Sequence, residues 1–217
     1  MDIVKALSAN KSGLTRTEIS EAVHIDSGSG LSEMLDDLVA CDFIRSYRNG
    51  LKKNGEIYQL MDFYTLFYLQ FCANPSSDRY FWKNTLNSPQ QNTWYGLSYE
   101  RVCMAHIQEI LRALHLDTIH TEYYSFRSKD ASPKVQIDLV IDRSDDFVDI
   151  IEIKYSRIRY EMTKEESEKI ERRVSRFINE TKTRKGVQTV LITTLGCEKN
   201  RNADVCQRFL TLDELFI

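Results

Sequence analysis

Two apolar runs joined by a polar turn decide the fold of this chain: Gln136-Ile137-Asp138-Leu139-Val140-Ile141-Asp142 and Val148-Asp149-Ile150-Ile151-Glu152-Ile153-Lys154. Short runs rich in Val and Ile and bounded by polar residues predict buried β-strands. The connector Arg143-Ser144-Asp145-Asp146 consists of residues that favour turns, so the two strands are expected to pair as a hairpin.

Three charged residues interrupt these runs, and they are the first candidate functional residues. Asp138 lies within the first run, and Glu152 and Lys154 lie two residues apart in the second. Residues i and i+2 of a strand point to the same face of a sheet, so Glu152 and Lys154 are expected to project together. Buried charges are costly unless they pair or bind a metal. Two alternatives are therefore open, a metal site and an internal ion pair.

Composition sets wider bounds. The 217 residues are enough for one large domain or two small ones, and the formal net charge of −3 means that any surface for nucleic acid must be local. The five cysteines show no CxxC spacing and the four histidines no paired-ligand spacing, which argues against zinc and for a reducing compartment. With no signal peptide at the start and no apolar run near the ~18 residues of a membrane span, a soluble cytoplasmic protein is expected.

Residues 1–62 are predicted to form a winged helix-turn-helix domain. Apolar residues at helical spacing, a capping box at Thr15 and Glu18, and a Ser-Gly turn predict three short helices. Two β-prone runs, Phe43–Tyr47 and Glu56–Leu60, flank a polar loop and predict a hairpin. This order of elements is that of a winged helix-turn-helix domain.

This predicted domain could read DNA or serve for packing and protein contacts. Its third helix carries only acidic charges, which duplex phosphates disfavour in a recognition helix: Glu33, Asp36 and Asp37. The predicted wing is basic: Arg45, Arg48, Lys52 and Lys53. Any DNA affinity is therefore expected to depend on the wing, and both alternatives stay open.

Residues 63–92 are predicted to be a helical linker, and residues 93–217 a second domain. The aromatic residues and leucines of 61–71 surround a helical axis, which indicates a buried helix, and 79–91 is expected to be irregular. The second domain is predicted to contain a long amphipathic helix, three strands, a charged helix, and at least one more strand: 95–114, 121–126, 136–142, 148–154, 163–182 and 187–194. The fold class is thus α/β, or α+β overall, with helices on both sides of a mixed sheet.

A helix glutamate, a strand aspartate and a Glu-x-Lys on the next strand resemble the catalytic layout of the PD-(D/E)XK nuclease superfamily, whose core is a restriction-endonuclease-like α/β/α sandwich. The matching residues here are Glu100, Asp138, Glu152 and Lys154. Ile137 stands where the motif name has proline. From Leu14 onward the chain also resembles the C-terminal region of archaeal-type AAA+ ATPases, in which a winged helix precedes such a domain.

The resemblance implies a nuclease site that uses Mg²⁺ or Mn²⁺. Asp138, Glu152 and Glu100 would hold the metal, and Lys154 would orient the attacking water or stabilise the transition state. The competing reading is a non-catalytic module that binds DNA or a partner protein. No GxxxxGK[ST] phosphate loop occurs in the sequence, so an ATPase partner would act from elsewhere in a longer chain or from another protein.

Overall fold

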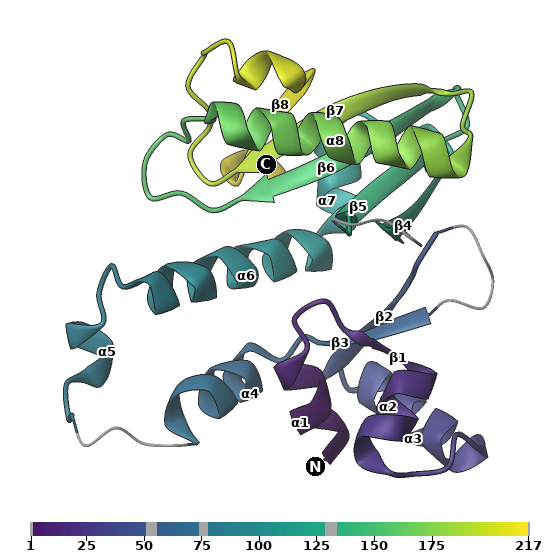
Figure 1. The fold of residues 1–217 in the computed structure, drawn as a ribbon, viewed down its shortest axis with the longest axis vertical. Coiled ribbons are helices and arrows are strands. Elements are labelled where there is room, and N and C mark those ends of the chain that lie inside the picture. The colour runs from purple at the N-terminus through teal and green to yellow at the C-terminus, as the bar shows by residue number, and fades with distance from the viewer. Residues whose placement is uncertain (1, 51–55, 74–77, 129–133, 217) are drawn as a thin grey trace. The chain divides into compact units, whose positions relative to one another are not determined.

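The computed structural model describes residues 2–50, 56–73, 78–128 and 134–216. The chain divides into two compact units, Met1–Trp94 and Tyr95–Ile217, which are described separately below. Their elements are labelled in Figure 1.

The first unit begins with helices and a small antiparallel sheet, as predicted. The helices are α1 (Asp2–Ala9), α2 (Arg16–Val23) and α3 (Ser29–Ala40), and the strands are β1 (Leu14–Thr15), β2 (Ile44–Arg48) and β3 (Glu56–Leu60). β3 is the central strand, in the order β1-β3-β2. The fully buried side chains of this unit come from all three helices and from the hairpin: Leu7, Ile19, Leu31, Leu35, Ile44, Ile57 and Leu60.

Two local features fix the entry to α2. The predicted capping box is confirmed, because the Thr15 side chain accepts from the backbone N–H of Glu18 while the Glu18 carboxylate accepts from that of Thr15. Gly13, just before it, has φ +74°, and a Cβ there would lie 2.5 Å from the backbone oxygen of Tyr58. Only glycine therefore permits this close approach to β3.

The segment after the hairpin differs from the prediction in two ways. The helix α4 (Phe63–Phe67) and the π-helical turn η1 (Tyr68–Cys72) are not buried all round, because Tyr64 and Tyr68 are exposed and their rings stack 6.4 Å apart. Residues 79–91 are also not irregular throughout, since they contain the helix α5 (Phe81–Asn84) and the start of α6 (Pro89–Ala105).

The two helices that were not predicted within residues 79–91, α5 and the start of α6, each have a physical cause. Proline is well tolerated at the first position of a helix, where its missing N–H is not needed, so Pro89 begins a helix instead of marking a loop. The short α5 is supported by tertiary contacts that local sequence does not reveal. Trp82 packs edge-on against Phe67 and Phe71, with ring centroids 5.0 and 5.2 Å apart.

The second unit is built on a five-stranded mixed sheet of order β4-β5-β6-β7-β8. Its strands are β4 (Thr121–Arg127), β5 (Gln136–Arg143), β6 (Phe147–Lys154), β7 (Gly186–Thr193) and β8 (Arg208–Thr211). The pairs β4–β5 and β5–β6 are antiparallel, whereas β6–β7 and β7–β8 are parallel. The predicted hairpin, the mixed sheet and the helix crossover, α8 (Lys164–Thr181), are confirmed.

Helices cover the two faces of this sheet (Figure 1). Phe177 of α8 packs with Val140 and Ile150 on one face. On the other face, residues of α6 and of α7 (Ile107–Ala113) pack with Leu139 and Ile151. The predicted single helix over 95–114 is wrong, because the chain leaves helical geometry at His106, with φ −113° and ψ 41°.

None of the helices in the described part of the chain combines the length and apolar character that a membrane span requires.

Candidate functional site

Asp138 and Glu152 occupy equivalent positions on adjacent strands. The ladder between β5 and β6 runs from Asp142 opposite Val148 to Leu139 opposite Ile151. Asp138 and Glu152 are each the next residue beyond that last pair. Side chains alternate along β6, so Glu152 shares a face with Ile150. In β5 the register with β4 shifts between Ile137 and Val140, and both of these residues pack with Phe177, so simple alternation does not apply at Asp138. The Glu152 carboxylate, which also contacts Arg173 of α8, therefore belongs to the face that α8 covers.

Glu152 is held by two cations. Its Oε1 lies 2.8 Å from Nζ of Lys154, so the predicted proximity of these two residues is confirmed. Its Oε2 accepts from Nη1 of Arg173, which comes from α8. The Glu152 side chain is only 12% exposed, so these contacts compensate much of the cost of removing its charge from water.

Arg173 is not among the site residues predicted from the sequence, although the sequence contains a signal for it. Ile170, Val174 and Phe177 form the apolar stripe with which α8 packs on the sheet. Arg173 is three residues after Ile170, so it lies on this stripe where an apolar residue would be expected. A cation on the packed stripe of a helix indicates a buried anion opposite, which here is Glu152.

Asp138 is half-buried, and its Oδ1 accepts a hydrogen bond of 2.7 Å from Nε2 of Gln136. Glu100 is carried by α6, whose neighbouring residues Tyr99 and Cys103 pack on the sheet face opposite α8. The structure thus brings Glu152 and Lys154 together, places Asp138 at the neighbouring position on β5, and puts Glu100 on a helix that covers the sheet face opposite α8.

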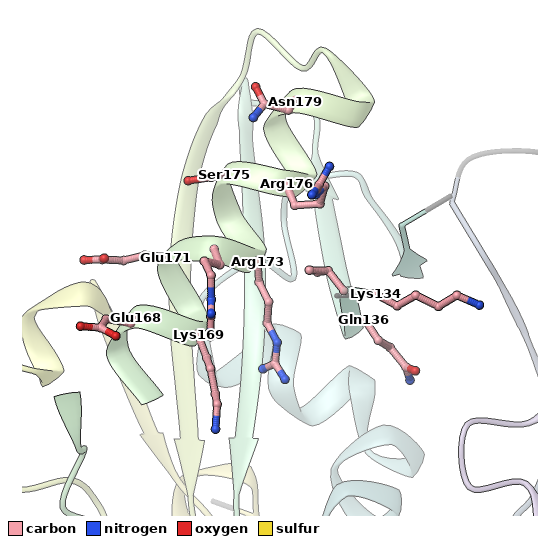
Figure 2. Close-up of a pocket in the computed structure, with 11 residues that line it drawn as sticks. Lys134, Gln136, Glu168, Lys169, Glu171, Arg173, Ser175, Arg176 and Asn179 are labelled. Carbon is pink, nitrogen blue, oxygen red and sulfur yellow. The ribbon is translucent and has the colours of Figure 1, made fainter. Parts of the chain in front are cut away.

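A groove of about 900 Å³ runs along α8 beside these carboxylates (Figure 2). Its lining includes five cationic residues and two glutamates: Lys134, Lys169, Arg172, Arg173, Arg176, Glu168 and Glu171. Two of its lining residues contact the carboxylates directly, since Arg173 pairs with Glu152 and Gln136 donates to Asp138. The groove and the carboxylates therefore form one continuous site.

The thiol and the phenol near Glu152 are both poorly suited to act as nucleophiles. Burial and the nearby Glu152 carboxylate raise the pKa of Cys206 to about 12, so this thiol stays protonated at neutral pH. Burial and a hydrogen bond to Glu166 likewise raise the pKa of the Tyr160 hydroxyl far above its usual range. The titratable chemistry of the site thus rests on carboxylates and cations.

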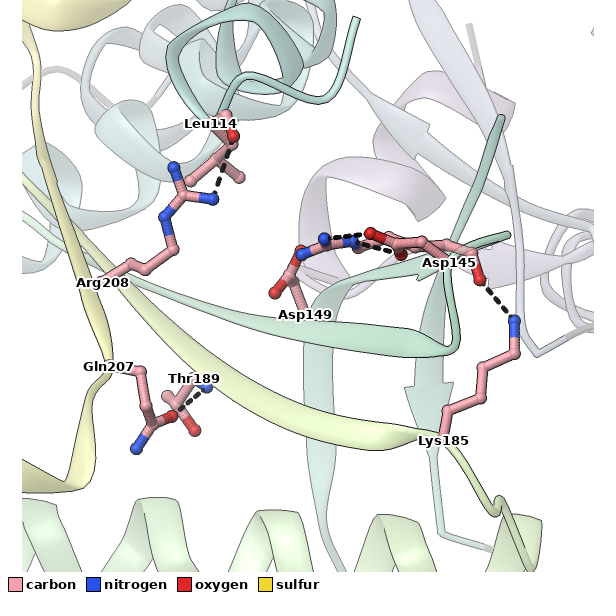
Figure 3. Close-up of polar contacts among 8 residues, drawn as sticks. Leu114, Asp145, Asp149, Lys185, Thr189, Gln207 and Arg208 are labelled. Atoms are coloured by element: carbon pink, nitrogen blue, oxygen red, sulfur yellow. Dashed lines mark hydrogen bonds and ion pairs between the residues drawn. The ribbon is translucent and has the colours of Figure 1, made fainter. Parts of the chain in front are cut away.

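A second charged cluster lies on the opposite face, near the other end of β6 (Figure 3). Asp149 is fully buried, and its Oδ2 lies 3.1 Å from Nη1 of Arg143. Arg143 also pairs with Asp145 in the hairpin turn. Nearby, Arg208 donates to the backbone oxygen of Leu114 over 2.9 Å. Asp149 is not among the candidate residues predicted from the sequence.

In the first unit, the acidic residues of α3 are exposed: Glu33, Asp36 and Asp37. Arg45 of the hairpin donates to Gln59 over 2.8 Å and lies over the ring of Tyr47. Arg48, another predicted wing cation, ends β2, whereas Lys52 and Lys53 fall outside the described residues.

Comparison of the chain with models of protein families, with curated proteins and with solved structures gives no match.

The donor chemistry of the site suits a divalent metal, with one condition. Asp138 and Glu152 offer the hard carboxylate oxygens that Mg²⁺ and Mn²⁺ prefer. Within the described ranges, however, no three Asp, Glu, His or Cys side chains are already grouped to hold a metal. Both oxygens of Glu152 already face cations, so a metal at Glu152 has to compete with Lys154 at Oε1 or with Arg173 at Oε2.

Proposed function

We propose that the second unit is a nuclease-like domain that hydrolyses phosphodiester bonds of nucleic acid with Mg²⁺ or Mn²⁺. The observation that carries the proposal is the position of Asp138 and Glu152 next to each other at the end of the β5–β6 ladder, with Lys154 beside Glu152 and a cation-lined groove whose residues contact both carboxylates. A phosphodiester strand needs cations along its backbone and acidic ligands for a metal at the cleaved bond. These features occur together here.

Each residue has a defined role in this proposal. Asp138 and Glu152 hold the metal, whereas Glu100, which α6 carries on the sheet face opposite α8, is a third ligand predicted from the sequence resemblance alone. The groove cations of α8 hold phosphates next to the cleaved bond, which fixes the position of the strand. Lys154 stabilises the negative charge that develops on the phosphate oxygens. The metal, when bound, supplies a water of lowered pKa and neutralises that charge.

The first prediction concerns cleavage of single-stranded and plasmid DNA with Mg²⁺ or Mn²⁺. Asp138→Asn and Glu152→Gln are each expected to lower the rate by roughly 100-fold or more, because metal catalysis contributes several kcal/mol to the barrier. Glu100→Gln tests the third ligand. Asp142→Asn is the matched control, since Asp142 lies on the same strand but pairs with Lys185. Equal rates for Asp138→Asn and Asp142→Asn would contradict the proposal.

A second candidate function is a non-catalytic module that binds DNA or a partner protein such as an ATPase. Two observations favour it: Glu152 is already neutralised by Lys154 and Arg173, and the exposed charges of α3 are acidic. The same assay separates the two candidates. A wild-type protein that binds DNA without cutting it, together with an Asp138→Asn variant at least as stable as wild type, would support the non-catalytic module.

A further inference from the structure

Arg173 is shared between two parts of the site. Its Nη1 donates to Oε2 of Glu152, while its side chain also lines the groove on α8. The side chain is 32% exposed, so its guanidinium can be reached from the groove. Figure 2 shows Arg173 extending from the helix between Lys169 and the segment that carries Lys134 and Gln136.

In the proposed site, the Glu152 carboxylate and a phosphate would compete for Arg173. Arg173 and a metal ion would in turn compete for Oε2 of Glu152. A carboxylate oxygen that accepts from a guanidinium is a poorer ligand for a metal, because the metal must displace a charge-assisted hydrogen bond. A guanidinium also binds phosphate oxygens, frequently with two parallel hydrogen bonds. A phosphodiester in the groove would therefore draw Arg173 away from Glu152.

We propose that Arg173 couples nucleic-acid binding to metal binding at Glu152. In the free protein Arg173 occupies Oε2 of Glu152 and weakens metal binding, and a bound strand takes Arg173 and frees that oxygen. Lys154 stays on Oε1 in both states and preserves part of the charge balance. This inference rests on the proposed function, since it assumes that Glu152 is a metal ligand and that the groove takes a phosphodiester strand.

Thermodynamic linkage gives the coupling a measurable form. A strand that strengthens metal binding by a given factor must itself bind more tightly by the same factor when metal is present. Couplings between two sites typically amount to about 5–150-fold. Substituting Arg173 should remove the coupling and strengthen metal binding in the absence of a strand.

The experiment measures Mn²⁺ binding from the EPR signal of free Mn²⁺, with and without a phosphorothioate-linked single-stranded oligodeoxynucleotide. In wild type the oligonucleotide is expected to tighten Mn²⁺ binding by about 5–150-fold. In Arg173→Gln, Mn²⁺ should bind more tightly than in wild type without the oligonucleotide, and its addition should change the affinity by less than about twofold. Thermal unfolding of each variant checks that it is folded.

Arg172→Gln is the matched control. Arg172 is next to Arg173 and lines the same groove, but within the described ranges it forms no ion pair. This variant should bind the oligonucleotide more weakly and keep the coupling. Coupling that is equally reduced in both variants would overturn the role of Arg173.

The remaining outcomes separate the two proposals. If Asp138→Asn abolishes Mn²⁺ binding while Arg173→Gln binds Mn²⁺ no better than wild type, the coupling is wrong and the metal site stands. If neither wild type nor Arg173→Gln binds Mn²⁺, with or without oligonucleotide, both the coupling and the proposed metal-dependent function fail.

Discussion

Asp149 is a carboxylate buried at an energetic cost that its partner offsets only in part. Burial raises its pKa, and the contact with Arg143 lowers it by less, so the pKa stays above its usual range. Its Oδ1 has no hydrogen-bond partner among the described residues. A buried carboxylate with one oxygen unsatisfied favours its protonated form.

The raised pKa of Asp149 makes the stability of the protein depend on pH. Because the pKa of Asp149 is higher in the folded than in the unfolded protein, its contribution to stability is full below the unfolded pKa and declines as pH rises through the folded pKa. Asp149→Asn removes this titration. We therefore expect the free energy of unfolding of wild type, relative to Asp149→Asn, to fall between pH 3 and pH 7 in urea titrations. A relative stability that rises with pH would contradict this.

At the scale of residues, sequence predicted contacts within an element better than contacts between elements. The pairing of Glu152 with Lys154 follows from the two-residue period of a strand, and the structure confirms it. Arg173 reaches Glu152 from a helix 21 residues later in the chain. That contact depends on how α8 is rotated over the sheet, which the local pattern around Glu152 does not encode.

The start of α8 illustrates how one element is specified. Oγ1 of Thr163 accepts from the backbone N–H of Glu166 over 3.3 Å, and the Glu166 carboxylate accepts from the backbone N–H of Thr163 over 3.1 Å. Burial alone would raise the pKa of Glu166, but hydrogen bonds from Tyr160 and Thr163 outweigh it and hold this pKa below its usual range. The charged form of Glu166 thus stabilises the helix start.

Thr163→Ala is expected to lower the free energy of unfolding by about 1 kcal/mol at pH 7. Because the pKa of Glu166 is depressed on folding, its contribution is present above its unfolded pKa and is lost as pH falls through the folded pKa. The effect of Glu166→Gln should therefore be larger at pH 7 than at pH 3. Ser175→Ala, an exposed position on the same helix, is the control, with an expected effect within about 0.5 kcal/mol. Equal free energies of unfolding for Thr163→Ala and Ser175→Ala, measured by chemical denaturation, would contradict the prediction.

Elements with a strong period were predicted well, and elements that depend on distant packing were not. The hairpin of β5 and β6, the charged helix α8 and the strand β7 follow from apolar periodicity, and the structure contains all of them. The short α5 depends on aromatic contacts with residues more than ten positions earlier, so its own four residues carry little local signal. The break at His106 interrupts an apolar stripe that continues on both sides of it, so the stripe alone could not reveal it.

The whole chain carries nearly equal numbers of acidic and basic residues, but the lining of the groove on α8 contains more basic than acidic ones. The formal net charge of −3 predicts no general affinity for polyanions, so binding must come from a local surface. Lys169, Arg172, Arg173 and Arg176 recur at three- and four-residue spacing on one side of α8. Between the first and the last of them the helix rises ~10 Å. That length corresponds to about three nucleotides at the duplex spacing of about 3.4 Å per strand.

The last prediction tests whether this surface determines nucleic-acid affinity. Arg172→Gln combined with Arg176→Gln should weaken binding of a single-stranded oligonucleotide. The slope of log K against log salt should become less steep by about 1.4, since each phosphate contact contributes about 0.7 for single strands. Lys199→Gln combined with Arg201→Gln is the charge-matched control, because these exposed residues lie in the segment between β7 and β8. Fluorescence anisotropy at several salt concentrations gives both slopes. Equal slopes for the two double variants would mean that net charge, and not the groove on α8, governs binding.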